Sequence, residues 1–242
     1  MSTLMAGFDT RKITRDELAL IPAPEATPTH QPIRHEDFAS EIEGGLSMRG
    51  IRVVSQEYAV SHDGMKCFGM IVTNQEFGGV NYAIGLRNSN DKSMKIGMVS
   101  GYRVLVCSNL AFAGDFTPLM AKHTSRFSLQ DAVALGVDRA HRGMRSVDDQ
   151  IRLLQGHEVG DVVAREFIYD AFVPKSGMRL PKQLMDTVHR EYFEPEVEEF
   201  QPRTAWSLAN AFTAAFKDLR PVRQFEEMGK FTPFLLRRLG LN

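Results

Sequence analysis

Two clusters of polar residues in the middle of the chain hold the side chains best suited to chemistry. The first is the run RNSNDKS, from Arg87 to Ser93. Its Asn, Ser and Asp residues form turns by bonding their own main chain, so the run predicts a turn. Seven polar residues exceed what a tight turn needs, however. Arg87 and Lys92, beside main-chain N–H groups, would suit a phosphate.

The second polar cluster lies further along the chain. It comprises Cys107-Ser108-Asn109, Gly114-Asp115 and Lys122-His123-Thr124. One interpretation is a strand end followed by a long loop with helix caps. In another, Asp115 and His123 form an acid/base or metal pair. In a third, Lys122, His123 and Arg126 contact a backbone phosphate. Because eight residues separate Asp115 from His123, the sequence does not determine their distance.

Several well-known motifs of enzymes are absent. The sequence has no phosphate-binding P-loop, no dinucleotide fingerprint after a strand, no zinc-ligand spacing and no G-x-S-x-G elbow. These absences argue against the common enzyme classes, although sites are often assembled from distant residues. We therefore expect a protein without catalytic residues, cofactor or metal.

Composition is that of an ordinary globular protein. The 242 residues are 43% apolar and 24% charged, with a formal net charge of −1, so no global charge demands a nucleic-acid or membrane partner. No apolar run approaches the roughly 18 residues of a membrane helix. The residues near the N-terminus carry charges where a signal peptide would need an apolar core. We expect a cytoplasmic protein with two buried thiols, Cys67 and Cys107.

Prolines and periodicity divide the chain. Four prolines between residues 18 and 34 predict an extended segment, and residues 1–34 are interpreted as a flexible arm that docks on its own or a neighbouring chain. Residues 35–242 are expected to form a single α+β domain, strand-rich over 50–110 and helical over 128–240. A first helix, from about His35 to Leu46, should end at Gly44-Gly45.

Alternating apolar residues predict about five strands in an antiparallel meander. The Asp63-Gly64 pair predicts a type I′ hairpin, with the return strand running from Met65 to Thr73. The third strand contains Val80 to Leu86, and two more, 94–99 and 102–108, should meet at Ser100-Gly101. Four aromatic residues on these strands are expected either in the core or on a surface that stacks bases: Tyr58, Phe68, Tyr82 and Tyr102.

Helical periodicity follows the strands, which indicates an α+β fold rather than alternating β-α-β units. Ser128 is the expected N-cap of a long amphipathic helix. Asp161 and Thr204 should cap later helices, and Pro181 should occupy a first helical position. A short helix around Phe231 to Leu236 closes the chain, and Trp206 is expected in the core.

The polar motifs resemble those of a known family. The runs RNSNDKS (87–93), GYRV (101–104), VCSN (106–109), KHT (122–124) and AWSLANAFT (205–213) are similar to the phage/plasmid-like family called domain of unknown function 932. Asn90 stands where that family more usually has His, which argues against a catalytic role there. The resemblance implies carriage on phages, prophages or plasmids, hence a host-cell cytoplasm, and no established activity.

Three functions stay open. The first is single-stranded nucleic-acid binding or annealing by a homo-oligomer, a fold-level analogy with phage annealing proteins that combine a hairpin sheet with a helix. Its contact residues would be Arg87, Lys92, Lys95, Arg103, Lys122, His123 and Arg126. The second is binding of a host protein, such as a defence system that it inhibits, through the arm and the acidic segment 191–199. The third is a metal-dependent hydrolase or nuclease using Asp91, Asp115 and His123.

Overall fold

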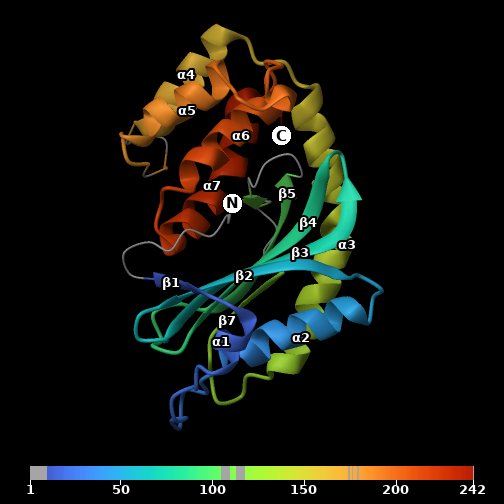
Figure 1. Ribbon diagram of the computed structural model, residues 1–242, viewed down its shortest axis with the longest axis vertical. Coiled ribbons are helices and arrows are strands. Elements are labelled where there is room, and N and C mark those ends of the chain that lie inside the picture. Colours follow the sequence, from blue (N-terminus) through green and yellow to red (C-terminus); the bar gives the residue numbers. More distant parts are fainter. Residues whose placement is uncertain are drawn as a thin grey trace.

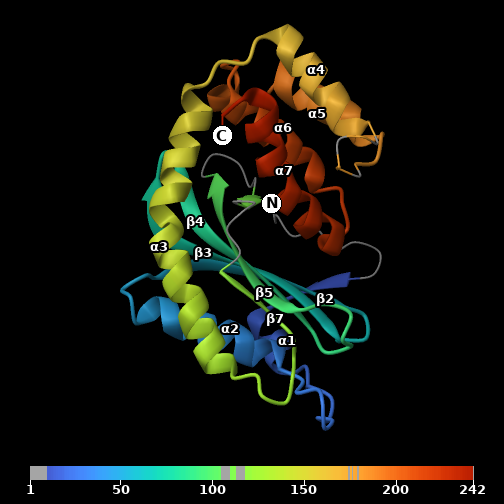
Figure 2. The same cartoon turned by 180° about the vertical axis from the view of Figure 1, so that it is seen from behind.

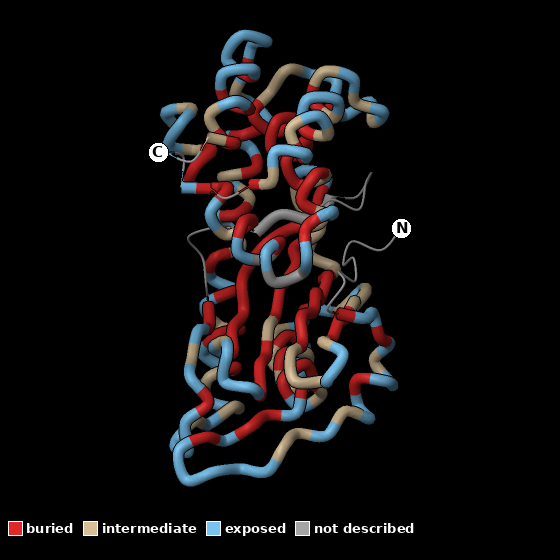
Figure 3. Tube along the Cα trace, turned by 90° about the vertical axis from the view of Figure 1, so that its left-hand side faces the viewer, coloured by how far each residue is buried: buried red, intermediate tan, exposed pale blue. Residues whose placement is uncertain are grey.

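The structure is a computed structural model that describes residues 10–104, 110–112, 118–173, 175, 177–178 and 180–241. A sheet and the helices beside it occupy one end of the elongated molecule, and four helices occupy the other (Figures 1 and 2). Figure 3 shows buried positions continuing from the strands into the helical end, where one cluster of apolar side chains joins the two. The predicted α+β class is confirmed.

The sheet has seven described strands and is antiparallel throughout. The strands follow in the order β1-β2-β3-β4-β5-β6, and β7 pairs with β5 beside β6. Their bounds are β1 Thr10–Ile13, β2 Val53–Ser61, β3 Lys66–Phe77, β4 Val80–Ser89, β5 Ile96–Val104, β6 Leu110–Phe112 and β7 Leu119–Ala121. The predicted meander is β2 to β5. The four aromatic residues on it lie in the core, each at most 4% exposed, so they offer no surface for base stacking.

Two turn predictions are wrong in detail. Ser100-Gly101 lies inside the continuous strand β5, opposite Ile84 and Ala83 of β4. The buried Tyr82 hydroxyl is hydrogen-bonded to Ser100 Oγ at 2.7 Å, so pairing with neighbouring strands overrides the local turn signal. The β2–β3 hairpin exists, but only Gly64 of the Asp63-Gly64 pair has positive φ, whereas a type I′ turn needs both.

Two helices cover one face of the sheet. Helix α2 (His35–Ser47) continues past Gly44-Gly45, contrary to the prediction, because Gly45 allows close contact with α3. A Cβ at Gly45 would lie 3.2 Å from Val137. Helix α3 (Leu129–Gly156) begins after its predicted cap, Ser128, whose side chain accepts a hydrogen bond from the Asp131 N–H. It runs along the sheet and on to the helical end (Figure 2).

The helical end comprises α4 (Asp161–Phe172), α5 (Leu184–Phe193), the 3₁₀ turn η2 (Glu198–Phe200), α6 (Ala205–Phe216) and α7 (Pro221–Leu239). Thr204 caps α6 as predicted. Gly160, rather than Asp161, is the N-cap of α4, and α5 begins three residues after Pro181. The last helix is longer than the short helix predicted around Phe231 to Leu236; Pro221 occupies its first turn, and Pro233 lies inside it. Trp206 is buried against Tyr102 of β5.

The part of the predicted arm that the structure describes, residues 10–34, lies on its own chain. Strand β1 pairs with β2, and the short helix α1 (Arg15–Ala19) follows it. The proline-rich stretch then runs without a helix to α2. No helix in the described part of the chain is both long and apolar enough to cross a membrane.

Gly69 in the centre of β3 gives a test of this packing. A Cβ there would lie 2.7 and 2.8 Å from ring carbons of the buried Tyr58 and 3.0 Å from Leu86 Cγ. Gly69→Ala should therefore lower the free energy of unfolding by about 1–3 kcal/mol. The exposed Gly44 of α2 has no atom within 4 Å of such a Cβ, and Gly44→Ala should raise stability by about 0.5–1 kcal/mol. Urea unfolding followed by Trp206 fluorescence measures both, and equal effects would contradict the packing described here.

Candidate functional site

The RNSNDKS run forms the end of β4 and the turn that leads to β5. Arg87 to Ser89 belong to the strand, and the residues after them form the turn that the sequence predicts. Lys92 adopts φ +67°, the left-handed region that side chains other than glycine rarely occupy. Such backbone conformations concentrate at functional sites, where the surrounding contacts maintain them.

Asp91 holds this turn together. Its carboxylate accepts hydrogen bonds from the Ser89 hydroxyl and the Ser93 N–H, and it pairs with Lys66 Nζ at 3.0 Å. Burial raises the pKa of Asp91, but the hydrogen bonds from Ser89, Ser93 and Lys66 outweigh this and hold the pKa well below its usual range. Asp91 is therefore an ionised structural residue whose oxygens are already used.

Asn88 and Asn90 bind the proline-rich stretch to the sheet. Both side-chain amides donate to the Ile33 carbonyl, at 2.8 and 3.0 Å, and the Ile33 N–H donates to Asn90 Oδ1 at 3.0 Å. Both asparagines are at most 5% exposed. We call this group the Ile33 clamp. It fixes the position of residues on either side of Ile33.

His35, on the α2 side of the clamp, is neutral and in a defined tautomer. Its Nε2–H donates to the Gly64 carbonyl at 2.8 Å, so its Nδ1 accepts from the Asn88 amide at 2.9 Å. Burial lowers the pKa of His35, and the bond to Gly64 opposes this only in part. The clamp thus connects α2, the β2–β3 turn and β4.

His30, on the other side of the clamp, packs against His123. The two rings are stacked, with centroids 5.4 Å apart. His30 Nδ1 lies 3.0 Å from the His123 carbonyl oxygen, and His30 Nε2 lies 3.3 Å from that of Asn90. Since carbonyl oxygens only accept, both bonds form together only when both ring nitrogens carry protons.

The ring of His123 is buried, and no described residue forms a hydrogen bond with it. Its side chain lies between His30 and Phe127, and the residue is 6% exposed. Neither ring nitrogen has a partner within the described part of the chain. Burial first, and then the neighbouring His30 and His35, lower its pKa to about 4. A buried polar group without a partner is uncommon in proteins and calls for an explanation such as a bound ligand.

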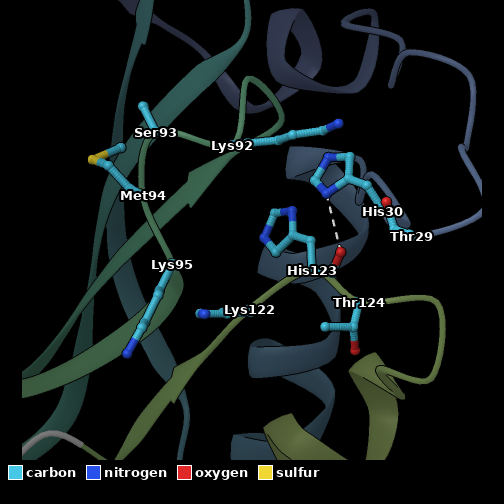
Figure 4. Close-up of a pocket in the computed structure, with 9 residues that line it drawn as sticks. All are labelled: Thr29, His30, Lys92, Ser93, Met94, Lys95, Lys122, His123 and Thr124. Carbon is cyan, nitrogen blue, oxygen red and sulfur yellow. Dashed lines mark hydrogen bonds between the residues drawn. The ribbon is translucent and has the colours of Figure 1, made fainter.

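A pocket of about 370 Å³ lies against this histidine pair. Three segments line it: Thr29 and His30 from the proline-rich stretch, Lys92 to Lys95 from the β4–β5 turn, and Lys122 to Thr124 after β7. Figure 4 shows the His123 ring at the centre of this group, with Lys92 and Lys122 on opposite sides of it in that view. We call it the basic pocket.

Within the part of the chain that the structure describes, no acidic residue lines the basic pocket. Its three lysines, Lys92, Lys95 and Lys122, are exposed, and no salt bridge joins any of them to another described residue. By contrast, Lys66 on the far side of the same turn is paired with Asp91. The pocket therefore combines uncompensated positive charge with an unpartnered imidazole, which suits an anion.

The family comparison covers this whole arrangement. The family described as a domain of unknown function (DUF932) matches residues 29–232. The chain belongs to this family. The matched region begins at the pocket residue Thr29 and includes the Ile33 clamp and the other pocket residues. Neither the curated proteins nor the solved structures include a match.

The structure brings four of the seven predicted contact residues together: Lys92, Lys95, Lys122 and His123 line the basic pocket. Arg126 is exposed but does not line it. Arg103 pairs with Glu57 at 3.6 Å. Arg87 contacts Met120 Sδ, and burial lowers its pKa while Glu226 opposes the change.

His30 is the main pocket residue that the sequence reasoning missed. A single histidine in a proline-rich stretch gives no local signal. Its contacts with Asn90 and His123 depend on chain segments 60 and 93 residues away. Only the fold reveals it.

Only part of the predicted metal site lies among the residues that the structure describes. Asp115 lies outside the described residues, as do Cys107, Ser108, Asn109 and Gly114. Asp91 is occupied by its own turn, as shown above. Among the described residues no three His, Cys, Asp or Glu side chains gather as metal ligands. The other cysteine, Cys67, is buried as predicted, and burial raises the pKa of its thiol.

The Ile33 clamp can be tested by removing its donors. Asn90→Ala should lower the free energy of unfolding by about 1–3 kcal/mol, because it leaves the Ile33 N–H without its acceptor and removes one of the two donors to the Ile33 carbonyl. Trypsin should also cleave after Arg34 faster than in the unaltered protein. Asn81→Ala, on β4 but outside the clamp, is the control. Unchanged stability and proteolysis in Asn90→Ala would show that the clamp does not hold this segment.

His123 should make stability depend on pH. Its pKa is about 4 in the folded protein against 6.5 ordinarily, so between these values the unfolded chain binds a proton that the folded protein does not. The free energy of unfolding should thus fall as pH drops from 7.5 to 4.5, with His123 contributing on the order of 2–3 kcal/mol.

His123→Gln removes this contribution and keeps that of His35, whose lowered pKa acts in the same direction. Urea unfolding at both pH values should therefore show a smaller loss in His123→Gln than in the unaltered protein. Equal losses in the two proteins would contradict the buried, neutral state of His123.

Proposed function

We propose that this protein binds single-stranded nucleic acid through phosphate groups held at the basic pocket. The observation that carries the proposal is the lysine trio beside the unpartnered His123, with no carboxylate among the lining residues. Lysine ammonium groups contact phosphate oxygens as point charges, and an imidazole N–H can donate to the same oxygens. Such contacts are the sequence-independent part of nucleic-acid binding.

A single strand suits the pocket better than a duplex. The histidine wall of the pocket is buried and the lysines at its rim are exposed, so a ligand must bend into the recess to reach His123. A flexible strand can do so, whereas the backbone of a duplex is stiff over this length. Since the aromatic residues of the sheet are in the core, affinity should come from phosphates and should fall with salt.

Protein binding is a second candidate function. Two apolar side chains one heptad apart on α4, Val162 and Tyr169, are 68% and 62% exposed. The acidic segment predicted as a contact surface carries the exposed residues Glu194, Glu196, Glu198 and Glu199. On this hypothesis the protein forms a stoichiometric complex with a host protein and has no affinity for nucleic acid.

A charge-matched pair of variants tests the nucleic-acid proposal. Lys92→Ala with Lys122→Ala removes two rim charges, and Lys12→Ala with Lys182→Ala removes two exposed charges elsewhere. Fluorescence anisotropy with a labelled oligonucleotide should show salt-dependent binding that the first variant weakens for every sequence. Its slope of log K against log salt should become shallower by about 1.4, or roughly 0.7 for each lost contact.

The control variant should bind like the unaltered protein. Absence of binding at about 50 mM salt, the low end of the range over which phosphate contacts weaken, would overturn the proposal in favour of protein binding. Equal losses in the two variants would show that the pocket is not the contact site. Light scattering with and without the oligonucleotide tests the predicted homo-oligomer.

A further inference from the structure

We propose that the basic pocket is a terminal-phosphate site, which binds a phosphomonoester at the end of a strand or on a free nucleotide. The inference deepens the proposed function and, for the strand, rests on it. A phosphomonoester carries up to two negative charges and three free oxygens, whereas the diester inside a strand carries one charge and two. The site therefore distinguishes a strand end from a strand interior.

The charge at the pocket matches the larger anion. Lys92, Lys95 and Lys122 approach from two different segments, and no acid among the lining residues neutralises them. A diester would leave more of this charge uncompensated than a monoester. Three separate ammonium groups can also serve three oxygens, each by a charge-assisted hydrogen bond.

The shape of the pocket favours a group with a single substituent. His30 and His123 form the inner wall and are 7% and 6% exposed, while the three lysines are exposed at the rim. The wall blocks one side of a phosphate that contacts it. The rest of the ligand can therefore extend from that phosphate only toward the rim. The volume, about 370 Å³, is near the lower end for small-molecule sites, roughly 300–1,000 Å³. It suits one nucleotide unit.

His123 supplies the group that recognises the phosphate at the wall. Its ring nitrogens have no partner among the described residues, and the stacking on His30 and Phe127 fixes the ring plane. The Ile33 clamp fixes His30 in turn, through the bond of its Nε2 to the Asn90 carbonyl. The neutral ring can donate its one N–H to a phosphate oxygen. An arriving dianion also stabilises the protonated imidazole, so binding should take up a proton.

The experiment uses the full chain and three oligonucleotides of one sequence with an internal label. One has a 5′-phosphate, one a 3′-phosphate and one hydroxyl groups at both ends. One of the two phosphorylated strands should bind about tenfold more tightly than the strand with hydroxyl groups at both ends. Lys92→Ala with Lys122→Ala should abolish this preference, and the control Lys12→Ala with Lys182→Ala should retain it. Thymidine monophosphate, titrated alone by calorimetry, tests the free nucleotide as a source.

The outcomes separate this inference from the proposed function. Equal binding of all three strands, without binding of the nucleotide, overturns the terminal-phosphate site and leaves strand binding intact. Nucleotide binding without strand binding supports the site and overturns the proposed function. No binding of any probe overturns both.

Calorimetry in two buffers of different ionisation enthalpy tests the part played by His123. Monophosphate binding at pH 7 should take up more protons in the unaltered protein than in His123→Gln, by up to about half a proton, because an opposite charge raises a pKa by roughly 1–3 units. Equal proton uptake in the two proteins would overturn the role of His123. The rim variants test the site independently, because their substitutions are at exposed positions and leave the core unchanged.

Discussion

Three hydrogen bonds to the main chain of Ile33 connect parts of the chain that are more than fifty residues apart. They join Ile33 to the side chains of Asn88 and Asn90, which are buried at the end of a central strand. A buried carbonyl or N–H without a partner would cost about 1–3 kcal/mol, so these bonds strongly favour one position of the proline-rich stretch. His35 then begins α2 against the β2–β3 turn, and His30 meets His123. The fold of the N-terminal part and the wall of the pocket depend on the same contact.

This arrangement explains a motif that at first suggests chemistry. Of the polar residues in RNSNDKS, Asn88 and Asn90 bind the main chain of another segment, and Ser89, Asp91 and Ser93 bind one another. Lys92 and Ser93 are the residues of the run that line the pocket, and Lys92 is the one that brings a charge to it. The family resemblance is therefore carried by residues that organise the site as well as by those that line it. The asparagine at position 90 fits this structural role, because its amide both donates to Ile33 and accepts from it.

Two features of the basic pocket lower the stability of the folded protein. Among the described residues, the buried His123 ring has no hydrogen-bond partner, and the three lysines that line the pocket have no acidic residue beside them in its lining. Both features are unfavourable in the protein alone, and the anion that we propose as ligand would compensate for them. Natural proteins accept such local losses at functional sites, where the rest of the structure supplies the stability. The long α3 helix and the shared core provide that support here.

The sequence by itself determined the features that depend on neighbouring residues. The strands β2 to β4, the caps Ser128 and Thr204 and the order of a strand-rich block before the later helices follow from local signals, and the structure has them. The alternation itself does not hold for burial, because β3 and β4 are buried at consecutive positions. Local signals gave wrong predictions where a contact with a residue distant in the sequence accompanies a different backbone conformation. Ser100-Gly101 pairs with β4 inside β5, and Gly44-Gly45 lies inside α2, where Gly45 approaches Val137 of α3 closely. The site follows the same rule. Its lysines could be picked out from their polar surroundings, but their convergence, the burial of His123 and the presence of His30 were decided by tertiary structure, because hydrogen bonds across sixty and more residues leave no periodicity in the sequence.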